Sequence, residues 1–121
     1  MVKSQIHETF KSFKGTSIPE VSKTVSDFVS QNKLAPKSLS VLNINGSFLV
    51  TIGYRTDETG YAVSIENLAL NFVGSAMVTM TVDQLDDRIN QAEDVIPGDV
   101  ICQSLFVNNC GMLEVAFLIH G

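Results

Sequence analysis

The stretch SIPEVSKTVSDFV, residues 17–29, carries the signals of a helix start followed by an amphipathic helix. Ser17 and Glu20 have the Ser-x-x-Glu spacing of a capping box, in which the serine hydroxyl accepts a backbone N–H and the glutamate reaches back. Pro19 lies in the first turn, where its missing N–H removes no helical hydrogen bond. The apolar residues that follow predict one buried stripe and a helix that ends near Asn32. This stripe consists of Ile18, Val21, Val25, Phe28 and Val29.

The stretch TVDQ, residues 81–84, has the same helix-start chemistry 64 residues further along the chain. It predicts a second amphipathic helix that ends at Pro97 and Gly98. The apolar stripe of this helix consists of Val82, Leu85, Ile89 and Ala92. Five positions at the two helix starts match at an offset of 64, and asparagine-containing turns follow at 64 to 65. The sequence therefore predicts two tandem βαββ units, about residues 1–60 and 61–121, within a single domain.

Turn residues indicate where the strands pair. Asn45 and Gly46 are the pair that a type I′ β-hairpin prefers, because both central positions need positive φ. The stretch NNCG, residues 108–111, predicts a second hairpin. The predicted fold class is α+β, with one antiparallel sheet shared by both units and two main amphipathic helices on one face of it.

Residues 61–80 fit two patterns. In the preferred one, a strand bends near Glu66 and Asn67, where the alternation changes phase, and SAMVTMTV forms a further strand. In the other, a short helix begins near Ile65 and ends at Gly74.

The composition is that of a small domain with a surplus of apolar residues. Of 121 residues, 45% are apolar and 17% are charged, and the mean hydropathy is +0.20. We interpret this surplus as a buried interface in a homo-oligomer, the alternative being an unusually apolar core. No run of 18 apolar residues predicts a membrane span, the first residues have no signal core, and two cysteines are too few for a disulfide framework. A cytoplasmic protein is expected.

Charge is divided unevenly along the chain. The first 37 residues hold six lysines and three acids, a net charge of +3, and the remainder holds ten acids and two arginines, a net charge of −8. The total of −5 argues against nucleic-acid binding. The basic segment fits either an anionic ligand or the acidic half of a neighbouring subunit, and an uneven spread by chance is the third possibility. The lysines are Lys3, Lys11, Lys14, Lys23, Lys33 and Lys37.

No group of residues has the spacing of a catalytic or metal site, so neither enzyme activity nor a cofactor is predicted. His7 and His120 lie at opposite ends of the chain, each without a metal-ligand neighbour at helical spacing. Cys102 is expected in the core and Cys110 in the second hairpin turn, where no base lies nearby. A disulfide between them is not expected, because Cys102 should face a residue near Phe117 across the hairpin.

Seven residues are candidates for holding a ligand. Arg55 ends a strand beside a turn, and Arg88 has no carboxylate three or four residues away on its helix, so either guanidinium could make forked bonds to phosphate. The amides in the two hairpin tips, NING (residues 43–46) and NNCG (residues 108–111), could read a nucleobase or ribose edge, although asparagine also suits turn geometry. A lysine on the basic helix and an aromatic residue beside Arg55 would complete such a site. The full set is Lys23, Lys33, Tyr54, Arg55, Arg88, Asn108 and Asn109.

The stretches FKGTSIPEVSKTVSDFVSQNKLAPKSLSV, residues 13–41, and GSFLVTIGYR, residues 46–55, look like the short helix–hairpin domains of small phage proteins. In length and order of elements, the whole chain is similar to the Thoeris anti-defence sponges, phage proteins that sequester cyclic ADP-ribose-type signals without degrading them. The resemblance implies a non-enzymatic homo-oligomer that captures a small anionic nucleotide, a cyclic nucleotide or an ADP-ribose-derived immune signal, in the host cytoplasm. The alternative is a small protein-binding inhibitor that acts through the acidic C-terminal half. A third possibility, an enzyme built on unfamiliar residues, predicts perturbed acids in a cleft.

Overall fold

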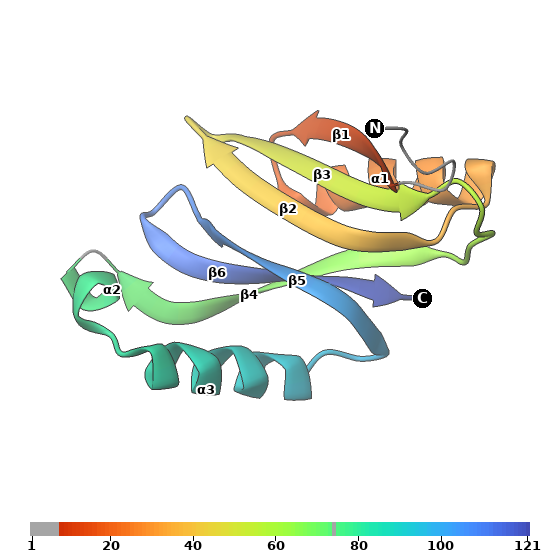
Figure 1. Cartoon of the computed structure of the whole chain (residues 1–121). Helices are drawn as coiled ribbons and strands as arrows, with labels where there is room; N and C mark the ends of the chain where they lie inside the picture. The colour runs from red at the N-terminus through yellow and green to blue at the C-terminus, as the bar shows by residue number, and fades with distance from the viewer. Residues whose placement is uncertain (1–7, 74) are drawn as a thin grey trace, which may run out of the picture.

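The computed structural model describes residues 8–73 and 75–121, which form two three-stranded antiparallel sheets and three helices (Figure 1). The first sheet has the strand order β1-β3-β2, and the second sheet has the order β4-β6-β5. The protein is therefore α+β, as the sequence predicts. The elements in chain order are β1 (Glu8–Gly15), α1 (Ile18–Asn32), β2 (Pro36–Ile44), β3 (Ser47–Arg55), β4 (Val63–Val73), α2 (Ser75–Thr79), α3 (Val82–Asp94), β5 (Asp99–Val107) and β6 (Met112–His120).

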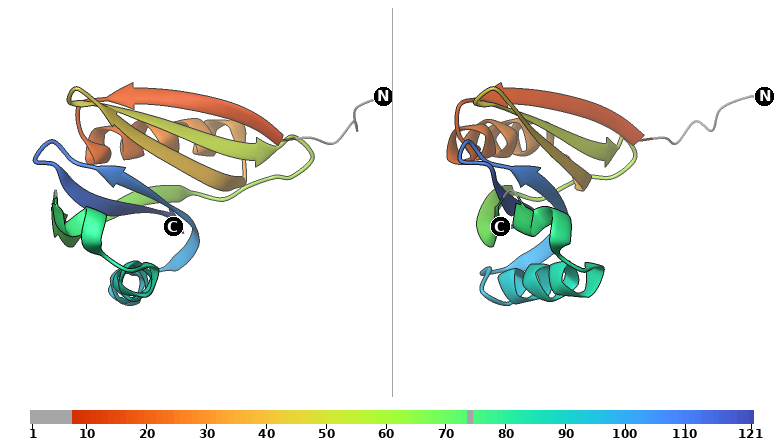
Figure 2. Two further views of the ribbon diagram at one scale, coloured as in Figure 1. Left: turned by 60° about the vertical axis from the view of Figure 1, so that its left-hand side comes forward. Right: turned by 90° about the vertical axis from the view of Figure 1, so that its left-hand side faces the viewer.

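The second sheet lies between the first sheet and α3 (Figures 1 and 2). One apolar cluster fills the space among the first sheet, α1 and the facing side of the second sheet. Another apolar cluster joins the opposite side of the second sheet to α2 and α3. As a result β6 has two buried faces, and its residues 115–119 are buried without the alternation of a half-exposed strand.

The single shared sheet predicted from the sequence is wrong. β2 lies beside β5 (Figure 1), but within the described residues the two strands belong to separate sheets, and the Val41 N–H donates to Ser104 Oγ at 3.0 Å. The helices also do not share a face, because α1 contacts β1 and β4 whereas α3 contacts β4 and β6. Stacking explains the difference: one sheet with both helices on one face would leave the second apolar face of β6 in water.

The irregularity in β4 lies further along the strand than predicted. The register of β4 with β6 is continuous up to Ala69 and shifts between Ala69 and Val73. Asn71 lies in this interval with a φ of 62°, a conformation that asparagine tolerates better than most residues. The bend predicted near Glu66 and Asn67 is therefore wrong in position.

The strand predicted over SAMVTMTV is also wrong, because Ser75–Thr79 forms the helix α2. Met77 and Met80 pack in the cluster between the second sheet and α3. A run this short has no decisive periodicity, so tertiary packing sets its conformation. Gly74, where the alternative helix from Ile65 was expected to end, lies outside the described residues.

The start and end of α1 follow the capping signals. Ser17 Oγ accepts the Glu20 N–H at 3.3 Å, and the helix ends at Asn32 with Lys33 in the left-handed region at a φ of 52°. The Glu20 carboxylate binds Thr16, at 3.0 Å from its backbone nitrogen and 2.6 Å from its hydroxyl. The bond to the hydroxyl, and to a smaller extent the bond to the backbone, hold the pKa of Glu20 below its usual value. The Glu20 side chain therefore accepts the N–H of Thr16, one residue before the Ser17 N–H that a capping box would use.

α3 begins with a complete capping box. The Gln84 N–H donates to the Thr81 hydroxyl at 3.1 Å, and the Thr81 N–H donates to Gln84 Oε1 at 2.8 Å. Val82, predicted as part of the buried stripe, is 74% exposed, so this part of the prediction is wrong. The other predicted stripe residues pack against that sheet; they are Leu85, Ile89 and Ala92.

The first hairpin is confirmed: Asn45 and Gly46 have φ values of 51° and 84° between β2 and β3. Each half of the chain has the order strand, helical segment, hairpin. The offset of 64 does not extend to the first strands, because β1 shifted by 64 falls on residues 72–79, the end of β4 and α2. In the described part of the chain, none of the helices is long and apolar enough to cross a bilayer.

Candidate functional site

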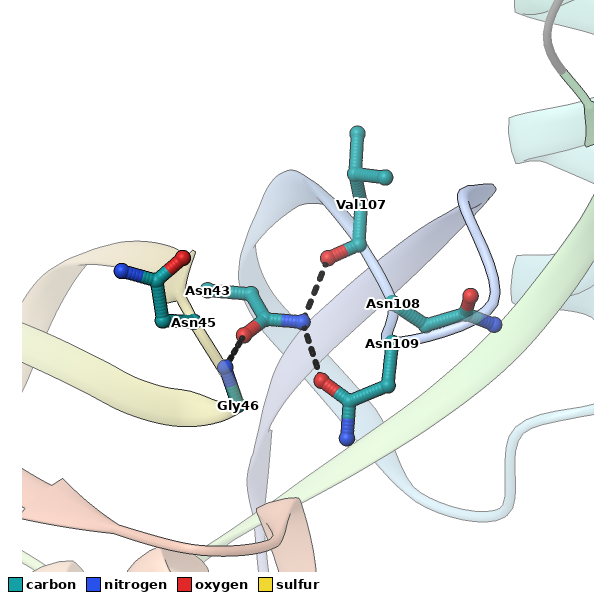
Figure 3. A pocket seen from close by; sticks show the side chains of 6 residues that line it. All are labelled: Asn43, Asn45, Gly46, Val107, Asn108 and Asn109. Carbon is teal, nitrogen blue, oxygen red and sulfur yellow. Dashed lines mark hydrogen bonds between the residues drawn. The ribbon is translucent and has the colours of Figure 1, made fainter.

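The tips of the two hairpins meet and border an open hollow of about 400 Å³. One tip joins β2 to β3 and the other joins β5 to β6, so residues about 64 positions apart in the chain form one site. Figure 3 shows four asparagine side chains around this hollow. The residues that line it are Asn43, Asn45, Gly46, Val107, Asn108 and Asn109, and none of them is charged.

Asn43 joins the two tips (Figure 3). Its Nδ2 donates to the Val107 carbonyl at 3.0 Å and to Asn109 Oδ1 at 2.8 Å. Its Oδ1 accepts the Gly46 N–H at 3.1 Å, which fixes the side chain to its own turn. One amide thus uses both its donor and its acceptor to hold the hollow in shape. Asn43 belongs to the predicted NING tip, but its role as the tie could not be predicted, because its partners lie 64 and 66 residues away in the chain.

Asn108 is committed to its own hairpin. Its Oδ1 accepts the N–H groups of Cys110 and Met112 at 2.9 and 3.0 Å, and its Nδ2 donates to a carboxylate oxygen of Glu114 at 2.6 Å. The other oxygen of Glu114 accepts from Asn67 Nδ2 at 2.6 Å. The amide of Asn108 is therefore already occupied within its own turn. This agrees with the alternative that asparagine is present there because it suits turn geometry.

Asn45 and Asn109 line the hollow and keep hydrogen-bonding groups without a partner in the described structure. Asn109 Oδ1 accepts from Asn43, while its Nδ2 bonds to no described residue. The Asn45 amide forms no side-chain hydrogen bond within the described parts of the chain. In Figure 3, Asn45 and Asn109 lie on opposite sides of the Asn43 side chain. These two amides are the groups that could bind a ligand in the hollow.

Tyr54 and Arg55 lie at the other end of β3, away from the tips. The guanidinium of Arg55 makes two bonds of 3.0 Å to the carboxylate of Asp57 and lies 3.7 Å from Glu58. This pairing raises the pKa of Arg55 and lowers that of Asp57. Tyr54 packs in the core against Phe28, with ring centroids 6.3 Å apart. The fork of Arg55 is thus already occupied by a carboxylate.

The remaining predicted cations are dispersed. Lys23 lies 3.5 Å from Asp27 and borders a separate hollow between α1 and β4, whereas Lys33 is exposed at the end of α1. Arg88 on α3 lies 5.8 Å from the centre of the Phe72 ring and has no ion pair among the residues described. Of the seven predicted residues, only Asn108 and Asn109 line the hollow between the tips.

The thiols and the imidazole among the described residues do not line the hollow. Cys102 is a free thiol, half-buried opposite Leu118, and burial raises its pKa to about 11. Cys110 is free and exposed. His120 is exposed, with its ring 4.1 Å from that of Tyr61, and both His7 and Lys3 lie outside the described residues. No three described His, Cys, Asp or Glu residues gather as a metal site.

Comparison of the chain with protein-family models, with curated proteins and with solved structures finds no match. The likeness to the Thoeris sponges therefore gains no further support from relatives. The residues around the hollow carry the functional interpretation.

Proposed function

We propose that the protein is a non-enzymatic binding protein that holds a small nucleotide-like molecule in the hollow between the hairpin tips. The observation that carries this proposal is the tie at Asn43, which holds two tips in contact while the Asn45 amide and Asn109 Nδ2 remain unbonded within the described residues. An amide offers a donor and an acceptor side by side, which complements a nucleobase edge or a pair of ribose hydroxyls.

The hollow recognises the neutral part of such a ligand. Its lining contains no charged side chain, and Arg55 is paired with Asp57. The phosphates of a nucleotide would then remain at the open mouth, in water. Binding should consequently depend little on salt, and a nucleoside should bind nearly as well as its nucleotide.

Sequestration follows if the ligand is an immune signal. A cyclic nucleotide or an ADP-ribose-derived signal presents both a nucleobase and ribose hydroxyls, and the protein would lower its free concentration without chemical change. We propose this sponge role in the host cytoplasm, with the protein acting as a homo-oligomer.

We also propose that the two halves derive from one βαββ unit. Supporting this relation, each half places its last strand at the centre of its sheet, with the other two strands outside. Asn43 and Val107, which meet across the two tips, are separated by 64 residues, the offset of the helix starts. α2 would be an insertion in the second unit.

Calorimetric titration tests the binding proposal with cyclic nucleotides, ADP-ribose isomers and the corresponding nucleosides. The key variant is Asn45→Gly, which removes the amide and keeps a residue suited to the φ of 51°. Lys33→Gly is the matched control, because Lys33 has a φ of 52° and lies about 30 Å away at the other end of β2.

Loss of one amide should weaken binding roughly two- to tenfold in Asn45→Gly. Lys33→Gly should bind like the parent protein. If no compound in the panel binds at millimolar concentration, the function is wrong. If Asn45→Gly binds as tightly as the control, the protein binds its ligand elsewhere.

A protein-binding inhibitor is the second candidate, favoured by the solvent face of α3. Its acids are exposed, and none has an ion pair among the residues that the structure describes. Such a face would engage a basic protein surface and release it at high salt. A pull-down that returns no stoichiometric, salt-sensitive partner would count against this role. The acids are Asp83, Asp86, Asp87, Glu93 and Asp94.

A further inference from the structure

Two open sheets have four edge strands, and three of the four edges are covered. β2 and β5 cover each other, joined by the bond from the Val41 N–H to Ser104 Oγ. The edge of β4 is covered by α1, where the Ile65 N–H donates to Ser22 Oγ at 2.8 Å. The edge of β1 has no such partner within residues 8–73 and 75–121. An uncovered edge is a template for another strand.

The hairpin between β2 and β3 determines which backbone groups of β1 face outward. A two-residue loop makes its flanking residues, Ile44 and Ser47, a hydrogen-bonded pair. Alternate residues of β3 therefore bond to β2, and the intervening ones, from Phe48 onward, bond to β1. The β3 residues that bond to β1 lie opposite odd-numbered residues of β1. The even-numbered residues of β1 therefore direct their N–H and C=O groups outward, away from β3. These are Glu8, Phe10, Ser12 and Lys14, all of them exposed.

We propose that a second copy of the chain pairs with this edge, β1 to β1 and antiparallel, about a two-fold axis at Lys11. The four outward-facing residues are symmetric about Lys11, so this register uses every outward backbone group of β1 in both copies. The two three-stranded sheets become one continuous six-stranded sheet. Such an isologous contact closes at two copies.

The charges along β1 fit this register. Residue numbers of facing residues sum to 22, so Glu8 faces Lys14 of the second copy, and Lys14 faces its Glu8. Residues opposite each other lie on the same face of the sheet, where unlike charges attract. Phe10, which is 63% exposed, faces Ser12 of the second copy and gains a neighbour on its open side.

Lys11 faces Lys11 of the second copy, on the side of the sheet that α1 covers. Its Nζ lies 5.8 Å from the centre of the Phe28 ring, so the charge is directed over α1 and away from the axis. The dimer does not use the hollow between the hairpin tips, so its failure would leave the proposed ligand site untouched.

Sedimentation velocity on the full chain, over a range of protein concentrations, tests the dimer with charge reversals. Glu8→Lys and Lys14→Glu each place like charges opposite one another twice, and each should raise the dimer dissociation constant on the order of tenfold or more. The double variant, Glu8→Lys with Lys14→Glu, restores both opposite pairs and should dimerise like the parent. Far-UV circular dichroism confirms that each variant is folded.

Mixing the two single variants gives a sharper result. Glu8→Lys carries lysine at both positions and Lys14→Glu carries glutamate at both, so a 1:1 mixture should form a heterodimer while each alone dissociates. A parent protein that stays monomeric up to millimolar concentration overturns the proposal. So does an oligomer that the single variants leave unchanged, or a mixture that does not associate.

Discussion

The tie at Asn43 should contribute measurably to stability, and Asn43→Asp isolates that contribution. The substitution keeps the size of the side chain and the Oδ1 that accepts the Gly46 N–H. It replaces Nδ2 by an oxygen, which then faces the Val107 carbonyl at about the present 3.0 Å and Asn109 Oδ1 at about the present 2.8 Å. Two hydrogen bonds are lost and two oxygen–oxygen repulsions are introduced.

The expected loss in the free energy of unfolding is about 2 kcal/mol. Each lost bond accounts for about 0.5–1.5 kcal/mol, or about 1–3 kcal/mol for the two. Water screens the repulsion, since both tips are at the surface, so the middle of this range applies. Urea unfolding followed by circular dichroism should show a midpoint lower by about 1 M.

Asn45→Asp is the matched control, because it makes the same chemical change two residues further along, at an amide without a hydrogen bond in the described structure. It should alter stability by less than about 0.5 kcal/mol. The Asn43→Asp deficit should also shrink below about pH 4, where a protonated carboxyl group can again donate. Equal stability of the two variants at pH 7 would refute the reasoning and show that the β2–β5 contact alone holds the tips together.

Three further results are expected. Gly60→Ala should destabilise the protein by about 3 kcal/mol in the same urea assay, because a Cβ there would overlap the Leu34 backbone carbonyl. Gly111→Ala, at a φ of 76° with open space around its Cβ, should lose only about 1 kcal/mol; equal losses would contradict the overlap. The Arg55–Asp57 pair lowers the pKa of Asp57, so its contribution is complete above the unfolded pKa and disappears as pH falls through the lower folded value. Asp57→Asn should therefore differ from the parent at pH 7 and converge with it toward pH 2, and a constant difference would contradict this assignment.

The local features of the fold could be predicted because neighbouring residues decide them. The helix from Ile18 to Asn32 follows from Ser17 and the apolar stripe, and the first hairpin follows from Asn45 and Gly46. Each signal acts over a few residues through a cap or a φ preference. Residues 75–79 lacked such a signal, so packing against the second sheet made them a helix.

The candidate site was predicted in part. The sequence predicts amides that could bind a ligand at both hairpin tips, but the contact between the two tips depends on how the two sheets stack. The pairing of Arg55 could have been anticipated, because Asp57 and Glu58 follow it within three residues of the sequence. The tie made by Asn43 could not be predicted, because its partners lie 64 and 66 residues away.

The sequence by itself determined where α1 and α3 begin and where the two hairpins turn, and that one half of the chain is basic and the other acidic. Only the tertiary structure decided that the strands form two stacked sheets, that the hairpin tips touch and that the outer edge of β1 has no strand partner among the described residues. Alternation tells which side of a strand is apolar, but not which surface will cover it. That choice depends on contacts between residues far apart in the chain, such as those that bury both faces of β6.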